Sequence, residues 1–299
     1  MKLASTAYPQ ALPQLRGRLA DYAELTKPRI AALVLFTVAI GGLLAAGGLP
    51  PRPLDLFHVV FGTALVAAGA SALNHLLERD SDALMRRTEQ RPLPTGRLTP
   101  AEALVFGSVL ATAGLVYLGL TLRHPAAAIL AGVSFVGYVV FYTPLKRRTP
   151  LNTLVGAVPG ALPPVIGWVA IRGQVEPGAV ALFAVLFLWQ VPHFLAIAWI
   201  HRDDYARAGL CMLPVRDHSG EHTARQMLRY CLMLVPTSLV PVFLGAAGPV
   251  YFVGALVLGL GFVLPAWTFG RERSVAQARR VLRYSLVYLP ALLALLLVD

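Results

Sequence analysis

The chain has 299 residues, of which 57% are hydrophobic and 14% are charged, and its formal net charge is +11. Soluble domains carry about a quarter charged residues, so this composition excludes an ordinary water-soluble globular protein. The apolar residues fall in runs of about 20, the length that crosses a bilayer as a helix. The composition predicts an all-α polytopic membrane protein, and the positive charge is assigned to membrane topology rather than to nucleic acid.

The N-terminal segment MKLASTAYPQALPQ contains no apolar core of signal-peptide length, and Pro9 and Pro13 interrupt it. It also lacks a long presequence rich in Arg and Ser, which favours a bacterial plasma (inner) membrane over an imported organellar protein. We assign residues 1–21 to a cytoplasmic N-terminal tail and residues 22–299 to a single membrane domain.

Nine hydrophobic segments follow along the chain. They are residues 30–49, 56–78, 102–121, 125–143, 151–171, 178–200, 227–246, 250–269 and 281–298. The N-terminal tail and the connections after the second, fourth, sixth and eighth segments hold 23 of the 26 lysines and arginines. Because basic residues flank membrane spans on the cytoplasmic side, this alternation predicts nine spans, with the N-terminus cytoplasmic and the C-terminus outside.

The fifth segment is irregular, because NTLVGAVPGALPPVIGW contains Pro159, Pro163 and Pro164. Prolines free backbone carbonyls and kink a membrane helix, which is tolerated where neighbouring groups or cavity water satisfy those carbonyls. We therefore expect a bent helix beside a central cavity, although kinked packing alone also explains such prolines.

Acidic residues are scarce, yet several cluster where the second segment ends, in NHLLERDSDALMRRTEQRPLPTGR from Asn74 onwards. If the helix continues past Asn74, then Asn74, Glu78 and Asp82 lie at i, i+4 and i+8 on one face, whereas Asp80 points elsewhere. Acids stacked near a helix C-terminus need cations to be stable. Either the neighbouring arginines form a solvated ion-pair cluster, or the oxygens hold Mg²⁺ together with a substrate phosphate.

A second polar cluster follows the sixth segment, in WQVPHFLAIAWIHRDDYARAGLCMLP. It contains His193, His201, Asp203, Asp204 and Tyr205. Its acids are placed to hold a second metal opposite the first, so that a diphosphate is clamped between two helices. The simpler explanation is packing, since a lone histidine on a membrane span is more often a hydrogen-bonded core residue than a ligand.

Basic residues for a phosphate site flank both clusters. An ammonium group binds diphosphate as a point charge, whereas an Arg fork donates to two oxygens at once. Each of these residues also has a simpler explanation as a positive-inside anchor. The candidate diphosphate-binding residues are Lys27, Arg29, Arg87, Arg91, Lys146 and Arg147.

Several functional classes find no support in the sequence. It contains no Walker A loop, no GxGxxG after a strand, no HExxH and no GxSxG, so nucleotide-driven pumping and serine hydrolysis are unsupported. The ionisable residues gather at one membrane face and do not line the middle of several helices. This distribution argues against a proton-coupled carrier with a midplane site.

Five blocks, in order along the chain, resemble the UbiA-type intramembrane prenyltransferases. They are LTKPR at 25–29, NHLLERDSDALMRRTEQRPLPTG at 74–96, YTPLKRRTPLN at 142–152, GALPPVIGW at 160–168 and WQVPHFLAIAW at 189–199. The resemblance covers roughly residues 22–230 and implies nine membrane helices around a central cavity.

The first motif of that family, NxxxDxxxD, falls on Asn74, Glu78 and Asp82, with Mg²⁺ and a prenyl diphosphate as the implied ligands. Here Glu78 replaces the middle Asp and is one methylene longer. The second motif of the family, DxxxD, has no counterpart, and only Asp204 is carried over from that region. The resemblance thus implies that Asn74, Glu78, Asp82 and Asp204 are catalytic and bind the metal.

The resemblance also implies the reaction, a Mg²⁺-dependent transfer of farnesyl from farnesyl diphosphate to a vinyl group of protoheme (heme B). The implied partners are these two substrates and the lipid bilayer, with a downstream heme-modifying enzyme or a terminal oxidase as further candidates. Heme is expected against His193 or His201, and the sequence does not separate the two. The candidates for a dry aromatic wall around the farnesyl cation are Trp168, Trp189, Phe194 and Trp199.

Two other functions stay open from the sequence. A UbiA-type enzyme that acts on another acceptor, such as a quinone-ring precursor, would share the acidic motif. A transporter or a heme-binding assembly protein without catalysis would tolerate alanine at Asn74, Glu78 and Asp82, whereas a metal-diphosphate site would not.

Overall fold

Nine membrane-length helical segments make up most of the computed structural model, which describes residues 11–299. The helices are α1 (Ala11–Leu25), α2 (Pro28–Ala46), α3 (Pro53–Asp82), α4 (Pro100–Thr121), α5 (Ala126–Val136), the π-helix η1 (Gly137–Tyr142), α6 (Thr143–Leu145), α7 (Asn152–Ala161), α8 (Pro163–Arg172), α9 (Pro177–Ile200), α10 (Arg202–Arg207), α11 (Leu213–Arg216), α12 (Glu221–Ser238), α13 (Val240–Phe243), α14 (Pro249–Glu272) and α15 (Val275–Val298). Within residues 11–299 there is no β-strand. The prediction of an all-α protein with nine spans is confirmed.

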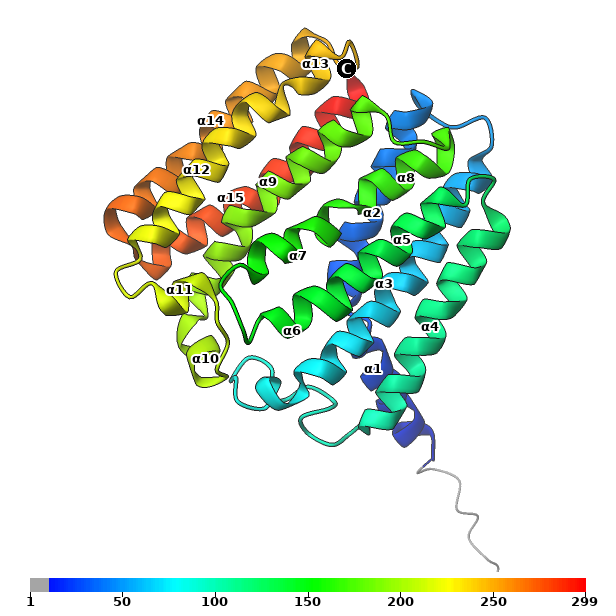
Figure 1. Cartoon of the computed structure of the whole chain (residues 1–299), viewed down its shortest axis with the longest axis vertical. Coiled ribbons are helices and arrows are strands. Elements are labelled where there is room, and N and C mark those ends of the chain that lie inside the picture. The colour runs from blue at the N-terminus through cyan, green and yellow to red at the C-terminus, as the bar shows by residue number, and fades with distance from the viewer. Residues whose placement is uncertain (1–10) are drawn as a thin grey trace, which may run out of the picture.

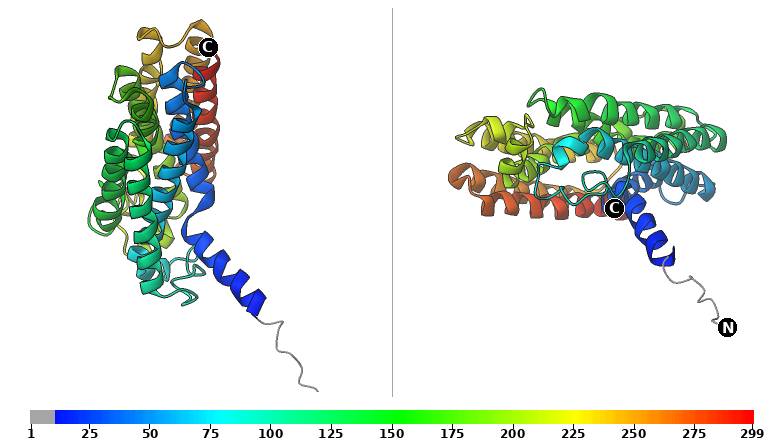
Figure 2. Two further views of the ribbon diagram at one scale, coloured as in Figure 1. Left: turned by 90° about the vertical axis from the view of Figure 1, so that its right-hand side faces the viewer. Right: turned by 90° about the horizontal axis from the view of Figure 1, so that it is seen from below.

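The two ends of the helix bundle differ in their connections (Figure 1). The short helices α10 and α11 lie at the same end as α1 and the long loop between α3 and α4, whereas residue 299 lies at the opposite end (Figures 1 and 2). We call the first the basic end and define it by its two long connections, residues 79–101 and 201–226. An odd number of spans agrees with the positions of α1 and residue 299 at opposite ends of the bundle (Figure 1). Which side is cytoplasmic stays a prediction.

The helix α1 runs through residue 21, where the tail was expected to end, and contacts α3. The side chain of Asp21 pairs with Arg97 of the loop between α3 and α4. The division into residues 1–21 and 22–299 stays a prediction, and residues 1–10 lie outside the described part of the chain.

The helix α3 is 30 residues long and continues past Asn74 to Asp82. Because the helix is unbroken from Asn74 to Asp82, the residues Asn74, Glu78 and Asp82 can share one face. Asp80 is 72% exposed and pairs with Arg79 at 3.3 Å. The prediction that Asp80 points away from the other acids is confirmed.

The fifth span breaks at Leu162, between α7 and α8, where two consecutive prolines begin the second half. Neighbouring helices satisfy carbonyls near the break. The hydroxyl of Ser134 donates to the carbonyl oxygen of Pro159 at 3.0 Å, and Gln190 Nε2 donates to that of Ala157 at 2.9 Å. The two halves pack differently, because α8 lies along α2 whereas α7 lies against α9 and η1. The predicted irregularity of this span is confirmed.

The packing of α8 on α2 is backbone to backbone. A Cβ atom on Gly167 would overlap the carbonyl oxygen of Val38, and one on Gly41 would overlap that of Pro164. Small residues allow membrane helices to approach in this way, since lipid offers no hydrophobic drive for association. The interior near the end opposite the basic end is therefore filled by α2 and α8.

We predict that Gly167→Ala lowers the stability of the protein by about 1–3 kcal/mol, the usual cost of overpacking, because the two backbones must separate. Thermal unfolding in one detergent measures the loss. Gly119→Ala on α4 is the matched control, because a Cβ atom there meets no other atom within 4 Å. Equal unfolding temperatures for both variants would contradict this account of the α2–α8 contact.

Candidate active site

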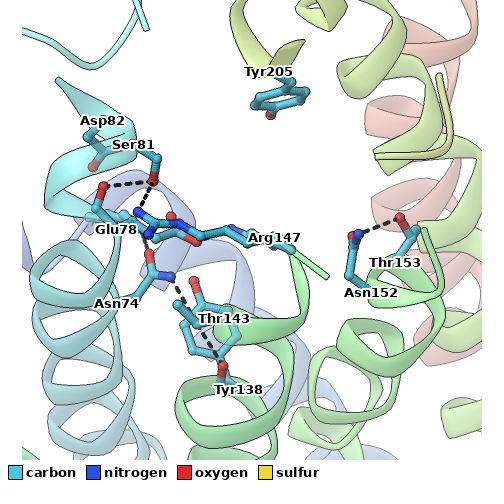
Figure 3. Close-up of polar contacts among 12 residues, drawn as sticks. Asn74, Glu78, Ser81, Asp82, Tyr138, Thr143, Arg147, Asn152, Thr153 and Tyr205 are labelled. Carbon is cyan, nitrogen blue, oxygen red and sulfur yellow. Dashed lines mark hydrogen bonds and ion pairs between the residues drawn. The ribbon is translucent and has the colours of Figure 1, made fainter. Parts of the chain in front are cut away.

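Asn74, Glu78 and Asp82 gather on one face of α3 near its end at the basic end of the bundle (Figure 3). Asn74 and Asp82 are each only 1% exposed, and the Glu78 side chain is 13% exposed. Figure 3 shows these side chains pointing into a common space, with Arg147 beside them, Tyr205 across from Asp82 and α7 on the far side. The three residues therefore share one face of α3, as their spacing predicts.

A separate cation faces each of the three motif residues. The contacts are Lys27 Nζ to Asn74 Oδ1 at 2.8 Å, Lys146 Nζ to Glu78 Oε1 at 2.6 Å and Arg91 Nη1 to Asp82 Oδ2 at 2.7 Å. The contact between Lys146 and Glu78 is an ion pair whose geometry does not meet that of a hydrogen bond. Arg147 adds a fourth cation, donating from Nη2 to the hydroxyl of Ser81 at 3.3 Å. Cations therefore outnumber the two carboxylates around this space.

Lys27 reaches the site through an unusual backbone conformation. Its φ of 49° lies in the left-handed region, which costs free energy for a residue with a side chain, and Pro28 begins α2 directly after it. Burial, and then the charge of Arg91, lower the pKa of Lys27 to about 7. Burial also disfavours the charge of Lys146, but the carboxylate of Glu78 outweighs it and raises the pKa of Lys146 well above its usual value.

The π-helix η1 supplies the floor of the site. It ends two residues before Pro144, which has no N–H to continue an α-helical ladder. Thr143 is buried, donates to the carbonyl oxygen of Tyr138 at 2.8 Å and accepts from Asn74 Nδ2 at 3.1 Å. The Lys146 ammonium lies 4.6 Å from the ring centroid of Tyr142. The wide turn thus orients both the amide of Asn74 and the ammonium of Lys146.

His75 is a site residue that the sequence interpretation missed. It is 2% exposed, and neither ring nitrogen has a hydrogen-bond partner among the described residues. Its position at i, i+3 and i+7 relative to Glu78 and Asp82 places it on their face of α3, which is the signal that would have identified it. A buried imidazole without partners is costly unless a ligand or water completes its hydrogen bonds.

The second polar cluster covers the site from α10. The hydroxyl of Tyr205 accepts a hydrogen bond of 3.4 Å from Arg87. Asp204 pairs with Arg207, and Asp203 is 90% exposed. The structure thus brings Arg87 and Tyr205 together across the two long connections of the basic end, while Asp203 faces away.

Asn152, which is fully buried at the start of α7, ties the basic-end loops together. Its Nδ2 donates to the carbonyl oxygen of Cys211 at 3.0 Å, and the amide of Cys211 donates to the carbonyl oxygen of Lys146 at 2.7 Å. The segment carrying Lys146 is thereby attached to the one that follows α10. The sequence interpretation assigned Asn152 no role.

The remaining candidates lie apart from the acids. Arg29 is exposed and makes no polar contact with the three motif residues among the described residues. His201 is half-buried at the C-terminal end of α9, and burial, then Arg87, lower its pKa. His193 lies two turns further into α9, where its Nδ1 is 2.7 Å from Ser285 Oγ.

Two of the aromatic wall candidates serve packing elsewhere. Trp168 is in α8, and its indole donates to Glu176 at 3.1 Å at the end opposite the basic end. Trp199 is buried edge-on against Phe269 of α14. Their assignment to a wall around the substrate is corrected, because tertiary contacts with other helices account for both. Trp189 stacks on His193 instead.

The donor set at α3 suits a hard cation. Within residues 11–299 no three His, Cys, Asp or Glu side chains form a complete metal site. Mg²⁺ needs no such cage, since one or two carboxylates and substrate phosphates usually hold it with water. Asp82 Oδ1 is buried and has no hydrogen-bond partner among the described residues, so one carboxylate oxygen is left for a ligand. The residues present therefore fit the group that the motif implies.

Comparison with known proteins gives the same result over nearly the whole chain. The profile of the UbiA prenyltransferase family matches residues 34–289. The chain belongs to the UbiA prenyltransferase family. A protoheme IX farnesyltransferase of Solibacter usitatus is 47% identical over 290 residues, covering 93% of this chain and 98% of the relative. One of Koribacter versatilis is 44% identical over 308 residues, covering 99% of both.

Solved UbiA structures share the fold. A digeranylgeranylglyceryl phosphate synthase superposes with a TM-score of 0.78 at 20% identity, covering 94% of this chain and 98% of the other. A UbiA homologue from Archaeoglobus fulgidus, bound to GPP and Mg²⁺, superposes with a TM-score of 0.61 at 19% identity, covering 92% and 99%. This UbiA protein is thus a multi-pass membrane protein with the prenyltransferase fold.

Proposed function

We propose that this protein is a protoheme IX farnesyltransferase, which transfers farnesyl from farnesyl diphosphate to a vinyl group of heme B and forms heme O. The similarity of 44–47% over nearly full length to relatives of that name supports the acceptor and the prenyl donor. The observation that carries the chemistry is the α3 face, where Asn74, Glu78 and Asp82 each meet a cation in a buried setting.

The excess of cations over acids at this face is suited to a diphosphate. Lys27, Arg91, Lys146 and Arg147 would bind its oxygens, and Arg87 would bind at the edge beside Tyr205. A bound diphosphate would neutralise the positive charge of these ammonium and guanidinium groups, which the two carboxylates do not balance. Arg29 is left out of this set, because among the described residues it makes no polar contact with the three motif residues.

Asn74, Glu78 and Asp82 would hold Mg²⁺, and Asp204 of α10 is our proposed ligand from the opposite side. Bound Mg²⁺ supplies neutralisation of the charge that develops on the departing diphosphate. The protein's own part is to hold Lys27, Lys146 and the arginines in place before the reaction, so that little reorganisation is needed.

The proposed reaction breaks the bond between C1 of farnesyl and the diphosphate oxygen, and diphosphate leaves with the electron pair. The vinyl group of heme attacks C1, and water adds to the resulting cation and loses a proton, which leaves a hydroxyethylfarnesyl side chain. A dry site protects the farnesyl cation from water before the vinyl group reaches it. The site itself contains three aromatic residues, Tyr138, Tyr142 and Tyr205.

Incubation of the purified protein with heme B, farnesyl diphosphate and Mg²⁺ tests the proposal. We expect a heme product whose mass equals that of heme B plus a farnesyl group and a hydroxyl group. The alternative is a UbiA enzyme for another acceptor, so a parallel reaction contains 4-hydroxybenzoate as a quinone-ring precursor. Prenylated benzoate without heme O would replace the proposed function by this alternative.

We place the protein in the bacterial plasma (inner) membrane with its basic end cytoplasmic, on the strength of the 23 Lys and Arg residues on that side. The product would pass to a downstream heme-modifying enzyme or a terminal oxidase. A cysteine introduced at exposed Asp203 should react with an impermeant maleimide only in inverted vesicles. Labelling in intact spheroplasts would reverse the orientation.

We predict that His75→Leu has opposite effects on stability and on substrate binding. Removing a buried imidazole without partners should raise the free energy of unfolding by about 1 kcal/mol or leave it unchanged. The KM for farnesyl diphosphate should rise, because the bound diphosphate, or a water bound to it, would lose the hydrogen bond that the imidazole of His75 provides. Unfolding in detergent and initial rates measure the two effects. A destabilised variant with unchanged KM would assign His75 to packing.

A further inference from the structure

His193 is a partly buried histidine of α9 whose ring is fixed by two residues that the proposed function does not use. Its Nδ1 lies 2.7 Å from the hydroxyl oxygen of Ser285 on α15. The indole of Trp189 stacks on the ring, with centroids 5.0 Å apart and planes 25° apart, and donates to the carbonyl oxygen of Ser285 at 2.8 Å. The imidazole is thus held in plane and in direction.

The hydrogen bonds of Ser285 also fix which nitrogen of His193 carries the proton. Ser285 Oγ donates its only hydrogen to the carbonyl oxygen of Leu282, at 2.7 Å. The hydroxyl therefore accepts from His193, which places the proton on Nδ1. Nε2 is left with a free lone pair. It has no hydrogen-bond donor among the described residues and is not one of their fully enclosed polar atoms.

The direction of His193 is towards the bundle interior. Along α9, helical spacing places His193 between Trp189, which bonds α15, and Gln190, which bonds α7. The helix α2 contacts both α9 and α15, and we infer that this sector of α9 lies on the side of α2. His193 lies seven residues before Ile200, or about 10 Å from the end of α9 at a rise of 1.5 Å per residue. By the same rise, Asn74 lies about 12 Å from the end of α3, so both residues are set back by similar distances from the ends of their helices.

We propose that Nε2 of His193 is the axial ligand of the iron of the heme substrate, with Ser285 and Trp189 as positioning residues. A neutral imidazole whose Nδ1–H is bonded to a neighbouring oxygen is the form that binds metals. At this depth a coordinated porphyrin would lie beside the α3 acids and not among the exposed arginines of the basic end. The inference rests on the proposed function for the identity of the acceptor, and it selects His193 over His201.

Heme B titrated into the full-length protein in lipid nanodiscs tests this assignment. With the wild-type protein, resonance Raman spectra of the ferrous complex should contain an iron–histidine stretching band. His193→Ala should lose the band and weaken heme binding about tenfold or more. His193→Gly with added imidazole should regain the band, which separates loss of the ligand from loss of the fold.

Three further variants make the assignment specific. Ser285→Ala should keep the band but shift it to lower frequency, because the imidazole loses the acceptor of its Nδ1–H. His201→Ala should change neither band nor affinity. His58→Ala is the matched control, since His58 Nδ1 is also bonded to a hydroxyl, that of Tyr117 at 2.7 Å, near the opposite end of α3.

The outcomes separate this inference from the proposed function. A band that persists in His193→Ala, or disappears in His201→Ala, overturns the assignment of His193 even if the wild-type protein forms heme O. A wild-type protein that binds heme through His193 but forms no heme O retains the site and refutes the proposed reaction. If the wild-type protein binds no heme, both are wrong.

Discussion

Asp82→Asn is expected to lower kcat/KM for farnesyl diphosphate about 10³-fold, the loss typical when one preorganised electrostatic group is removed. The substitution keeps the shape of the side chain and the hydrogen bond from Arg91, but it removes the negative charge of the oxygen that has no partner. Initial rates at saturating heme B and a fixed Mg²⁺ concentration measure the effect. Thermal unfolding confirms that the variant is folded.

Asp80→Asn is the matched control for Asp82→Asn. It removes the same charge two residues away on the same helix, but Asp80 is exposed and paired only with Arg79. Its kcat/KM should stay within about twofold of the wild-type value, as usual for surface substitutions. Raising the Mg²⁺ concentration should rescue part of the Asp82→Asn defect, and chelation of Mg²⁺ should abolish the wild-type activity. Similar losses in the two variants would contradict the assignment of Asp82.

Lys146→Met is expected to destabilise the protein by about 3 kcal/mol, because it leaves the buried carboxylate of Glu78 without its cation. Its transfer rate should also fall, since one of the proposed diphosphate contacts is lost. Arg148→Met removes an exposed cation two residues along the same loop and should change neither quantity. Denaturant unfolding in one detergent and initial rates give the two readouts.

Adding Glu78→Gln to Lys146→Met separates the two roles of the pair. The double variant should regain most of the lost stability, because no unpaired charge stays buried. It should not regain activity, since both a metal ligand and a diphosphate contact are then absent. A double variant that regained both would show that the pair only supports the fold.

Helix spacing accounts for much of what the sequence predicted at the site. Asn74, Glu78 and Asp82 share a face because one unbroken helix carries them, and a period of 3.6 residues is a local property of the chain. The same rule would have identified His75, had its position relative to Glu78 been considered. The number of spans was predictable because apolar length and the alternation of basic residues each determine it independently.

Contacts between segments that are distant in the sequence could not be predicted from helix periodicity or hydrophobic length. Lys146 was a candidate for phosphate binding only by composition, and its contact with Glu78 depends on how η1 widens before Pro144. Trp168 and Trp199 had the chemistry of a cavity wall, but tertiary packing directs both to other helices. The bond between His193 and Ser285 joins residues 92 positions apart, so no local pattern signals it.

The α2–α8 contact also has a consequence for the electrical properties of the membrane. The side chains of Val38, Ile166 and Val169, near the close contacts of Gly41 and Gly167, are at most 1% exposed. Such a seam leaves no room for water between α2 and α8, so this contact gives the hydrated groups at the basic end no route across the bilayer. A tight seam of this kind is what an enzyme with a highly charged leaving group needs in an energised membrane, where a wet path would conduct protons and dissipate the gradient.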